Sequence, residues 1–495
     1  MRNRFLHLGP ILAYLGALFR VFGFILLVPL VVLFIYSRAG YREVSPFYYI
    51  GPALLSWAIG SVLRWRWQEE GVITSASSMM VCGLGWLGIS AVGALPLWLG
   101  LDVSYLDAFF EAVSGFTTTG ITMLTGLDEM PRSLLFWRAL TQWLGGLGIL
   151  TFFLAIAFTG TSANQLFSAE THKIFSDRPA PGVLNTLRIL WSIYAGFTGL
   201  IAVLLVLEGV SVFDAITHSF TCLSTGGYSP YDASIAHYQA AGYAHYRLIE
   251  YTLTFGMMLG GMNFLVHYRV LTGGVKALWD NLEMRLFWTI LFGSAGLIAL
   301  SHFLQFGLSD VADTVRHVLF QTVSILTTTG FGTKDIGASY FPALAKQIFL
   351  VLMVIGGCVG STGGGIKVLR IGVLFKMAWR QVRRVLYGRS SVNPIVVDGA
   401  SVNVEEVRRI AGLFFAWMAL LLGGGMITAI LSDHPPMAAA SGMFSALGNI
   451  GPCYISVKAM TELHPVIKGI YIIGMLAGRL EILPIVLIFT PKAWR

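Results

Sequence analysis

Charge is scarce in this chain: only 12% of its 495 residues are Asp, Glu, Lys or Arg, roughly half the share found in a typical soluble domain. A soluble protein of this length would divide into about two or three domains with polar surfaces. Here 56% of the residues are hydrophobic, and apolar stretches recur from end to end. The composition leaves no room for a separate soluble domain and predicts an all-α integral membrane protein.

Cysteine is also rare. The four cysteines are widely spaced and lie mostly in apolar or turn segments, at Cys82, Cys222, Cys358 and Cys453. They form neither a disulfide framework nor a metal-ligand spacing. The predicted spans also lack paired carboxylates and nucleophile-base pairs, so the sequence disfavours a membrane-embedded enzyme.

The net charge of +8 does not indicate a nucleic-acid-binding surface. The basic residues lie in short loops between apolar spans, and such loops face the cytoplasm. We therefore expect both termini to be cytoplasmic and expect no nucleic-acid partner. A small-residue cleavage site is missing after Arg2 and Arg4, and the apolar run that follows is too long for the core of a signal peptide. It is predicted to remain as the first span.

About ten segments are apolar and long enough to cross the membrane. They lie at 10–36, 47–65, 72–101, 133–160, 184–208, 246–270, 286–306, 341–377, 408–432 and 464–490. Four others are too short, because a helix of about thirteen residues rises about 20 Å, less than the ~30 Å hydrocarbon core. Backbone that enters the membrane and stops needs surrounding protein or a water-filled cavity. These re-entrant segments are 107–119, 213–225, 313–329 and 439–450.

The short segments end in similar turns, which indicates an internal repeat. The turns are predicted at 117–120, 223–226, 327–330 and 448–451. A pair of small residues follows each turn in the next span and would allow close packing: Gly145-Gly146, Gly260-Gly261, Gly356-Gly357 and Ala477-Gly478. We predict four helix, pore-helix, helix units around one pore, at 71–182, 183–284, 285–400 and 401–495, preceded by two extra N-terminal helices at 1–70.

Each turn could bind a dehydrated cation. Selectivity filters replace the water shell of an ion with backbone carbonyls, and glycine takes the positive φ that such turns require. One copy alone would be an ordinary helix cap, but four copies in register favour a filter. The predicted ion ligands are Thr118, Thr119, Gly120, Ser224, Thr225, Gly226, Thr328, Thr329, Gly330, Asn449, Ile450 and Gly451; the fourth turn lacks hydroxyl groups.

A run of glycines interrupts the predicted span 341–377. It comprises Gly356, Gly357, Gly360, Gly363, Gly364 and Gly365, followed by Lys367. The run lacks the Gly-Lys-Ser/Thr ending of a phosphate-binding loop. So many glycines unwind a helix, which predicts a movable plug below the filter; the alternative is a kinked helix.

A single arginine lies well inside the last predicted span. Arg479 is expected to face a pore or a partner, because a charge within the membrane is costly. It either pairs with Glu481 or carbonyl groups to support packing, or places a positive barrier below the filter.

The four turns, their spacing and the ten spans resemble the Trk/Ktr/HKT superfamily of potassium transporters, and within it the bacterial TrkH/TrkG type. The resemblance covers essentially the whole chain. It implies potassium uptake across the bacterial cytoplasmic membrane, with potassium bound in the filter and no organic cofactor. It also implies that 356–367 and Arg479 form the gate. Gly120 stands where sodium-preferring plant relatives carry serine, which supports potassium.

The resemblance also implies partners. Proteins of this type form homodimers on a cytosolic ring of TrkA-like regulatory subunits that bind nucleotide. The basic loop 370–409 is a candidate docking surface, although attraction to anionic membrane lipid accounts for it equally well. Two functions remain open: a gated pore, favoured because the units run in parallel, or a potassium carrier coupled to protons or sodium.

Overall fold

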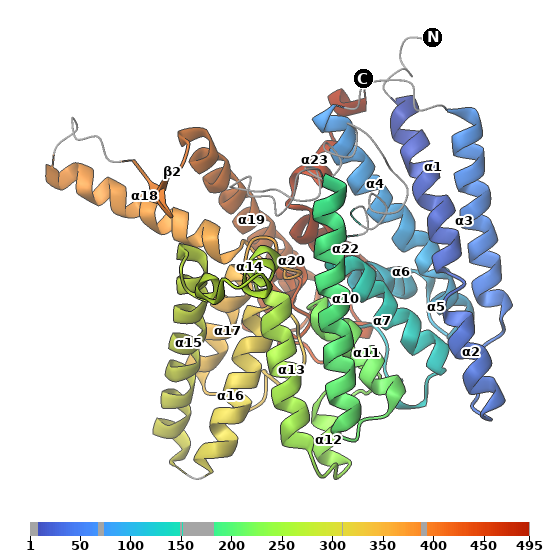
Figure 1. The fold of residues 1–495 in the computed structure, drawn as a ribbon, viewed down its shortest axis with the longest axis horizontal. Coiled ribbons are helices and arrows are strands. Elements are labelled where there is room, and N and C mark those ends of the chain that lie inside the picture. Colours follow the sequence, from blue (N-terminus) through green and yellow to red (C-terminus); the bar gives the residue numbers. More distant parts are fainter. Residues whose placement is uncertain are drawn as a thin grey trace.

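The computed structural model describes residues 8–67, 74–148, 151, 183–308, 310–387 and 394–494. The described chain is built almost entirely of helices (Figure 1). Its sheet has two antiparallel strands, β1 (Val396–Val397) and β2 (Ala400–Ser401). The predicted all-α class is therefore confirmed.

The first helices form one edge of the molecule (Figure 1). They are α1 (Leu8–Ile25), α2 (Pro29–Arg38) and α3 (Phe47–Arg66). A Cβ atom built on Gly60 would lie 2.5 Å from the carbonyl oxygen of Gly16. Glycines thus let α1 and α3 approach closely, as small residues do in membrane helix pairs.

The next elements lead through the first two short helices. They are α4 (Ser75–Gly93), α5 (Leu95–Gly100), α6 (Tyr105–Phe116), η2 (Leu127–Glu129), α7 (Arg132–Gly146), α10 (Val183–Leu207), α11 (Val212–Leu223), α12 (Ala236–Ala240), α13 (Tyr246–Gly261), α14 (Phe264–Leu271) and η3 (Val275–Leu278). Ser104 and Ser211 accept hydrogen bonds from the backbone N–H of Asp107 and Asp214. These caps fix where α6 and α11 begin.

The remaining elements contain the other two short helices. They are α15 (Leu282–Phe306), α16 (Val311–Leu326), α17 (Ala343–Ile355), α18 (Val368–Tyr387), α19 (Val404–Leu431), α20 (Pro436–Gly448), α21 (Val457–Thr461), α22 (Pro465–Leu480), α23 (Leu483–Ile488) and η4 (Pro491–Trp494). The helices α6, α11, α16 and α20 coincide with the four predicted re-entrant segments. That prediction is confirmed for their positions and lengths.

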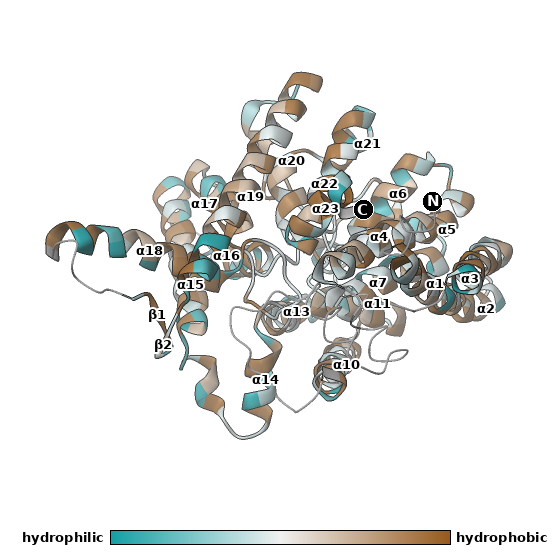
Figure 2. Ribbon diagram, turned by 90° about the horizontal axis from the view of Figure 1, so that it is seen from above, coloured by the Kyte–Doolittle hydropathy of each residue, from teal (hydrophilic) through white to brown (hydrophobic). Residues whose placement is uncertain are grey.

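Within the described residues, five helical segments are long and apolar enough to cross a membrane: Leu8–Arg38, Ser75–Gly100, Leu184–Leu207, Leu282–Phe306 and Val404–Leu431. Only 22% of the apolar window is buried in each of α10 and α15. The outer helices carry mostly hydrophobic residues when the molecule is viewed from above (Figure 2). Exposed apolar surface of this extent fits a lipid environment and not water.

Within the described residues, five of the ten predicted spans are interrupted, whereas only one interruption was expected. Short breaks divide the span 10–36 between α1 and α2 and the span 72–101 between α4 and α5. The span 246–270 breaks at Asn263, which caps α14 by accepting a hydrogen bond from Leu265 N–H. The span 464–490 breaks at Glu481 and Ile482, which both have positive φ. The predicted interruption of 341–377 is present. The end of the predicted span 133–160 lies outside the described residues.

The predicted loop 370–409 is largely ordered. Its first part continues α18, and β1 and β2 follow. The helix was not predicted because the loop was assigned from its basic residues between apolar spans, and Arg, Leu and Met also favour helices. The basic helix projects from the rest of the molecule (Figure 1).

The apolar core lies in two large clusters. One joins α1, α4, α6 and α7 to α20 and α22. The other joins α10, α11 and α13 to α15, α16 and α17. The last residues of α6 and α20 belong to the first cluster, through Phe116 and Leu447. Those of α11 and α16 belong to the second, through Leu223 and Leu326, so packed side chains precede each turn.

Candidate ion pathway

The four short helices end in the same backbone conformation. In each turn a residue other than glycine has a left-handed φ, and two positions later a glycine also has positive φ. The first set is Thr118 (54°), Thr225 (52°), Thr328 (61°) and Asn449 (55°); the second is Gly120 (83°), Gly227 (75°), Gly330 (88°) and Gly451 (104°). Threonine is uncommon in this conformation, and such strain concentrates at functional sites.

The second turn lies one residue further along the chain than predicted. The backbone N–H of Thr119, Thr329 and Ile450 donates to the carbonyl five residues earlier, and in the second turn Gly226 N–H makes this bond with Thr221 at 2.8 Å. Gly226 therefore corresponds to Thr119, and Gly227 corresponds to Gly120. The predicted register was wrong here because either of two consecutive glycines could take the positive φ. We refer to 117–120, 224–227, 327–330 and 448–451 as turns one to four.

The turns contact one another in a closed ring. A Cβ atom on Gly120 would overlap the carbonyl oxygen of Gly226, and one on Gly227 would overlap that of Thr329. The same relation joins turn three to turn four, where a Cβ on Gly330 would overlap the carbonyl oxygen of Ile450. Only glycine fits at these positions.

The ring closes between turns four and one. A Cβ on Gly451 would lie 3.0 Å from the carbonyl oxygen of Thr119, so this contact is looser than the other three. Asn449 strengthens it, because its Nδ2 donates to Thr119 Oγ1 at 2.8 Å and to the Met475 carbonyl at 3.0 Å. The structure thus brings residues from all four predicted turns together around one centre, with carbonyl groups that could replace the water shell of a cation.

Two oxygens in the turns are buried without a hydrogen-bond partner in the described part of the chain. They are Thr118 Oγ1 and Asn449 Oδ1, and both belong to the left-handed residue of their turn. Buried polar atoms without partners are costly and call for an explanation. A cation bound between the turns would provide one.

Small residues behind the turns allow the close packing expected of them. A Cβ on Gly145 would overlap the carbonyl of Phe116, and a Cβ on Gly478 would overlap that of Leu447. Each carbonyl belongs to the end of a short helix. The predicted role of the small-residue pairs is confirmed at these two sites.

The glycine segment, 356–367, lies directly against the turns and contains no helix. A Cβ on Gly364 would overlap the carbonyl of Gly448, and a Cβ on Gly363 would lie 2.9 Å from that of Thr327. The glycines therefore permit contact with turns three and four. The alternative of a kinked helix is wrong.

Hydrogen bonds also attach the glycine segment to turns two and three. Gly364 N–H donates to Thr328 Oγ1 at 2.7 Å. Thr225 Oγ1 donates to Thr362 Oγ1 at 3.2 Å, and Thr362 N–H donates to the Gly260 carbonyl at 3.1 Å. The segment is thus held at defined points and not merely packed.

Arg479 lies in the last turn of α22, beside this segment. Its guanidinium donates to the carbonyl of Thr362 and to the carbonyls of Gly145 and Gly146, each at 2.5 Å. Glu481 forms an ion pair with Arg370 at 2.6 Å. The positive charge of Arg479 therefore bridges the glycine segment to the end of α7.

A cavity of about 520 Å³ is lined by residues of the glycine segment but by none of the four turns. Its lining includes Lys367, Arg479 and Gly363 together with Arg269 and Glu283. The glycine segment therefore contacts both this cavity and the ring of turns. Lys367 Nζ donates to the Gly363 carbonyl in the lining of the cavity.

Sequence reasoning missed the side chains that support the turns. Gln142 Nε2 donates to the Gly226 carbonyl at 2.6 Å, and its Oε1 accepts from Tyr228 N–H at 3.0 Å. Glu111 and Arg138 form a buried ion pair nearby. The rule that flagged Arg479, a charge within an apolar segment, also applied to Glu111 and Arg138.

The fold and site define a class: a helical membrane protein in which an unwound segment covers a ring of four glycine turns. The TrkH family model, described as a cation transport protein, matches residues 52–495. The chain belongs to this family. The resemblance found in the turns is therefore confirmed.

Individual relatives are similar to this chain over nearly its full length. The chain is 33% identical to the Trk system potassium uptake protein TrkH of Escherichia coli K12, covering 99% of this chain and 100% of that protein. It is 31% identical to an uncharacterized cation transporter of Methanocaldococcus jannaschii, covering 97% and 94%. The crystal structure of the potassium transporter TrkH from Vibrio parahaemolyticus is similar, with a TM-score of 0.85, 29% identity and 100% of both chains covered.

Proposed function

We propose that this protein takes up potassium across the bacterial cytoplasmic membrane through a pore whose selectivity filter is the ring of four turns. The observation that carries this proposal is the cyclic contact between turns, in which a carbonyl of each turn meets a glycine of another. Such a ring offers oxygen ligands on all sides to a dehydrated monovalent cation. Family relatives described as potassium uptake proteins support potassium as that cation.

The glycine segment and Arg479 form the gate in this proposal. The segment contacts both the ring and the cavity, where a plug would block an ion leaving the filter. Arg479 adds a positive charge at the same depth, and a charge in a low-dielectric surrounding repels a cation strongly. The gate opens when the segment moves aside and its bonds to turns two and three break.

The direct test is transport by the purified protein in liposomes. We expect rubidium, as a potassium analogue, to enter down its own gradient and to be taken up in preference to sodium. The reversal potential should follow the potassium gradient alone. A reversal potential that shifts with the proton or sodium gradient would establish the coupled carrier, and absence of selective flux would refute the proposal.

The proposal also includes the oligomeric state, the orientation of the termini and the regulatory partner. The protein acts as a homodimer with both termini in the cytoplasm, and a TrkA-like subunit that binds nucleotide regulates it. Helix α18 supports a docking role: it projects from the rest of the molecule (Figure 1), and Phe375 and Val385 on it are 72% and 85% exposed. Membrane lipid remains the alternative contact. Co-purification of the two subunits, compared between intact protein and an Arg383→Glu/Arg384→Glu variant, tests the docking surface.

Replacement of Thr328 by valine should loosen the gate. The change keeps the shape of the side chain but removes the oxygen that accepts from Gly364 N–H at 2.7 Å. A hydrogen bond contributes about 1 kcal/mol net, so rubidium flux without a regulatory subunit should rise about fivefold. Flux from preloaded liposomes measures the change.

Thr118→Val is the matched control for this experiment. Thr118 holds the equivalent position in turn one, and its Oγ1 has no hydrogen-bond partner among the described residues. Both variants lose one hydroxyl from the ring, so any shared effect reports ion binding. Only the additional flux of Thr328→Val reports the gate, and equal flux from the two variants would contradict the assigned contact.

A further inference from the structure

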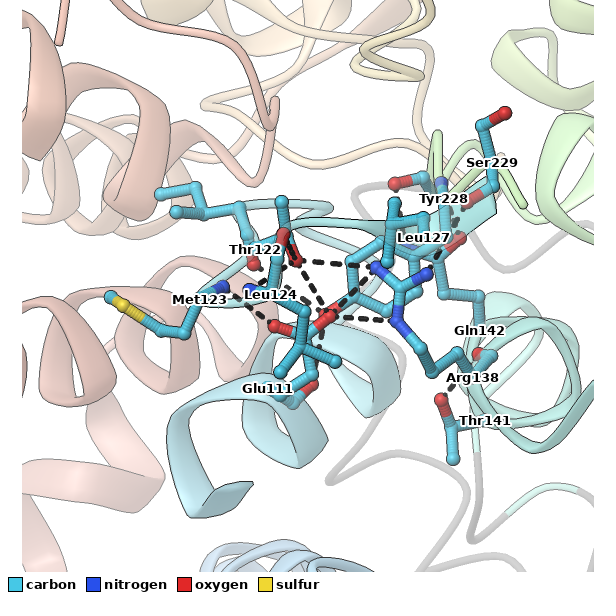
Figure 3. Close-up of polar contacts among 12 residues, drawn as sticks. Glu111, Thr122, Met123, Leu124, Leu127, Arg138, Thr141, Gln142, Tyr228 and Ser229 are labelled. Carbon is cyan, nitrogen blue, oxygen red and sulfur yellow. Dashed lines mark hydrogen bonds and ion pairs between the residues drawn. The ribbon is translucent and has the colours of Figure 1, made fainter. Parts of the chain in front are cut away.

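A buried charged cluster lies beside the chain segments that follow turns one and two (Figure 3). Glu111 comes from α6 and Arg138 from α7, and Arg138 Nε and Nη2 both lie 2.8 Å from Glu111 Oε1. The side chains are 0% and 2% exposed, respectively. The guanidinium stacks on the ring of Tyr228, 4.1 Å from its centroid. Three elements that are distant in the sequence therefore meet at one ion pair.

The ion pair also binds the chain that leaves turn one. Glu111 Oε2 accepts from Met123 N–H at 2.8 Å, and Oε1 accepts from Thr122 Oγ1 at 3.0 Å. Arg138 Nη2 donates to the same Thr122 hydroxyl at 3.3 Å. Residues 121–126 contain no helix or strand, so these bonds replace the backbone ladder that would otherwise fix their position.

The cluster holds the chain that leaves turn two as well. Arg138 Nη1 donates to the Ser229 carbonyl at 3.3 Å. The Tyr228 hydroxyl donates to the Glu111 carbonyl at 2.8 Å. Tyr228 directly follows Gly227, the glycine that contacts turn three. Movement of the ion pair would therefore shift two neighbouring turns together.

The positions that correspond to Glu111 before the other three turns carry different residues. Glu111 stands seven residues before the left-handed residue of its turn, and His218, Gln321 and Gly442 stand at the same spacing. Gln321 has a similar role for turn three, accepting from Thr333 N–H at 3.4 Å and donating to the Phe331 carbonyl at 3.3 Å. Those bonds are longer than the 2.8 Å bonds of Glu111, as expected because charged groups form shorter hydrogen bonds.

General stability does not account for this arrangement. Burial of an ion pair is costly, and apolar residues of similar volume are often at least as stable. What an ion pair with additional hydrogen bonds provides is a fixed geometry, and binding sites require their ligands to be held within about 0.5 Å. The hydrogen bonds of Glu111 and Arg138 fix the chain segments that follow turns one and two.

We propose that Glu111 and Arg138 are positioning residues for ion selectivity, which set the spacing of turns one and two through residues 121–124 and 228–229. The inference rests on the proposed filter function. The pair touches no ion; it determines where the glycine turns can lie. A ring held by a neutral pair should admit sodium more readily, because the turns can close around the smaller ion.

The test is the double variant Glu111→Gln/Arg138→Gln, measured for rubidium uptake and its inhibition by sodium in liposomes. The double change leaves no unpaired buried charge and places in unit one the amide found at Gln321. We expect the rubidium-over-sodium preference to fall about tenfold, while total cation flux stays within about threefold of the unmodified protein. An unchanged preference together with a lower melting temperature would overturn the inference, because it would leave the pair a purely structural role.

Asp107→Asn/Lys468→Gln is the matched control. This pair also starts from α6, at 2.5 Å, but its other bonds join the Thr461 carbonyl and the Ser104 hydroxyl at the N-terminal end of α6, away from the turns. Its loss should leave selectivity unchanged, and an equal tenfold loss would overturn the inference. If the double variant does not fold, Tyr228→Phe removes only the hydroxyl, which lies 2.8 Å from the Glu111 carbonyl and 3.5 Å from the Ile121 carbonyl. It should lower the preference about threefold, and full selectivity in that variant would also count against the role.

The unmodified protein separates this inference from the function on which it depends. Nonselective flux in the unmodified protein would refute the filter itself. Selective flux in the unmodified protein, with full selectivity in the variants that fold, would refute only the role of Glu111 and Arg138.

Discussion

Replacement of Gly227 by serine is expected to abolish the preference of the protein for potassium over sodium. Gly227 has a φ of 75°, and a Cβ there would overlap the backbone carbonyl of Thr329. That carbonyl cannot move aside as a flexible side chain can, so turns two and three must separate. A loss of about 3 kcal/mol in discrimination corresponds to about a hundredfold. Rubidium uptake in competition with sodium measures it.

Gly226→Ser is the matched control, because the two glycines are adjacent. A Cβ on Gly226 would meet the carboxamide of Gln142, the end of a side chain that can rotate away. The expected loss is about fivefold, the cost of one hydrogen bond between Gln142 and the turn. Equal losses in the two variants, or a larger loss at Gly226, would contradict the assigned register of turn two.

The positions of the short helices could be predicted from the sequence, but the register of turn two could not. The four short helices were predictable, because their length and the glycine that ends each turn are local features. The register of turn two was not. Both Gly226 and Gly227 can adopt positive φ, and the choice depends on the contact that Gly227 makes with Thr329 in another unit.

Breaks in the helices show the same limit. The six glycines between 356 and 365 predicted the unwound segment after Ile355, because glycine disfavours a helix. The break at Asn263 depends on one side chain that caps α14, and the break at Glu481 and Ile482 depends on two residues with positive φ. Neither break leaves a compositional signal, so the sequence predicts both of these spans as continuous.

The supporting residues were not predicted because their role depends on the three-dimensional arrangement. Glu111 and Arg138 are isolated charges in two different predicted segments. Nothing in their spacing shows that they meet, or that Tyr228 from the next unit covers them. Arg479 was selected from the sequence alone, but its three carbonyl partners come from two distant parts of the chain.

Replacement of Arg479 by alanine should give the largest increase in leak through the closed protein. The change removes a positive charge beside the glycine segment and the hydrogen bond that holds Thr362. Hydrogen bonds to charged groups contribute about 1.5–3 kcal/mol each, and loss of one corresponds to a rise of about tenfold to a hundredfold in flux. Rubidium efflux from preloaded liposomes, without a regulatory subunit, measures the leak.

Arg479→Lys separates the two contributions to this barrier. Lysine keeps the positive charge but cannot span the three carbonyls with a planar guanidinium. If the charge alone blocks the ion, this variant should stay nearly as tight as the unmodified protein. If the hydrogen bonds hold the glycine segment in place, it should leak almost as much as Arg479→Ala. Because the guanidinium joins the segment to α7, we expect the second outcome, and an alanine variant with unaltered flux would show that Arg479 is no part of the gate.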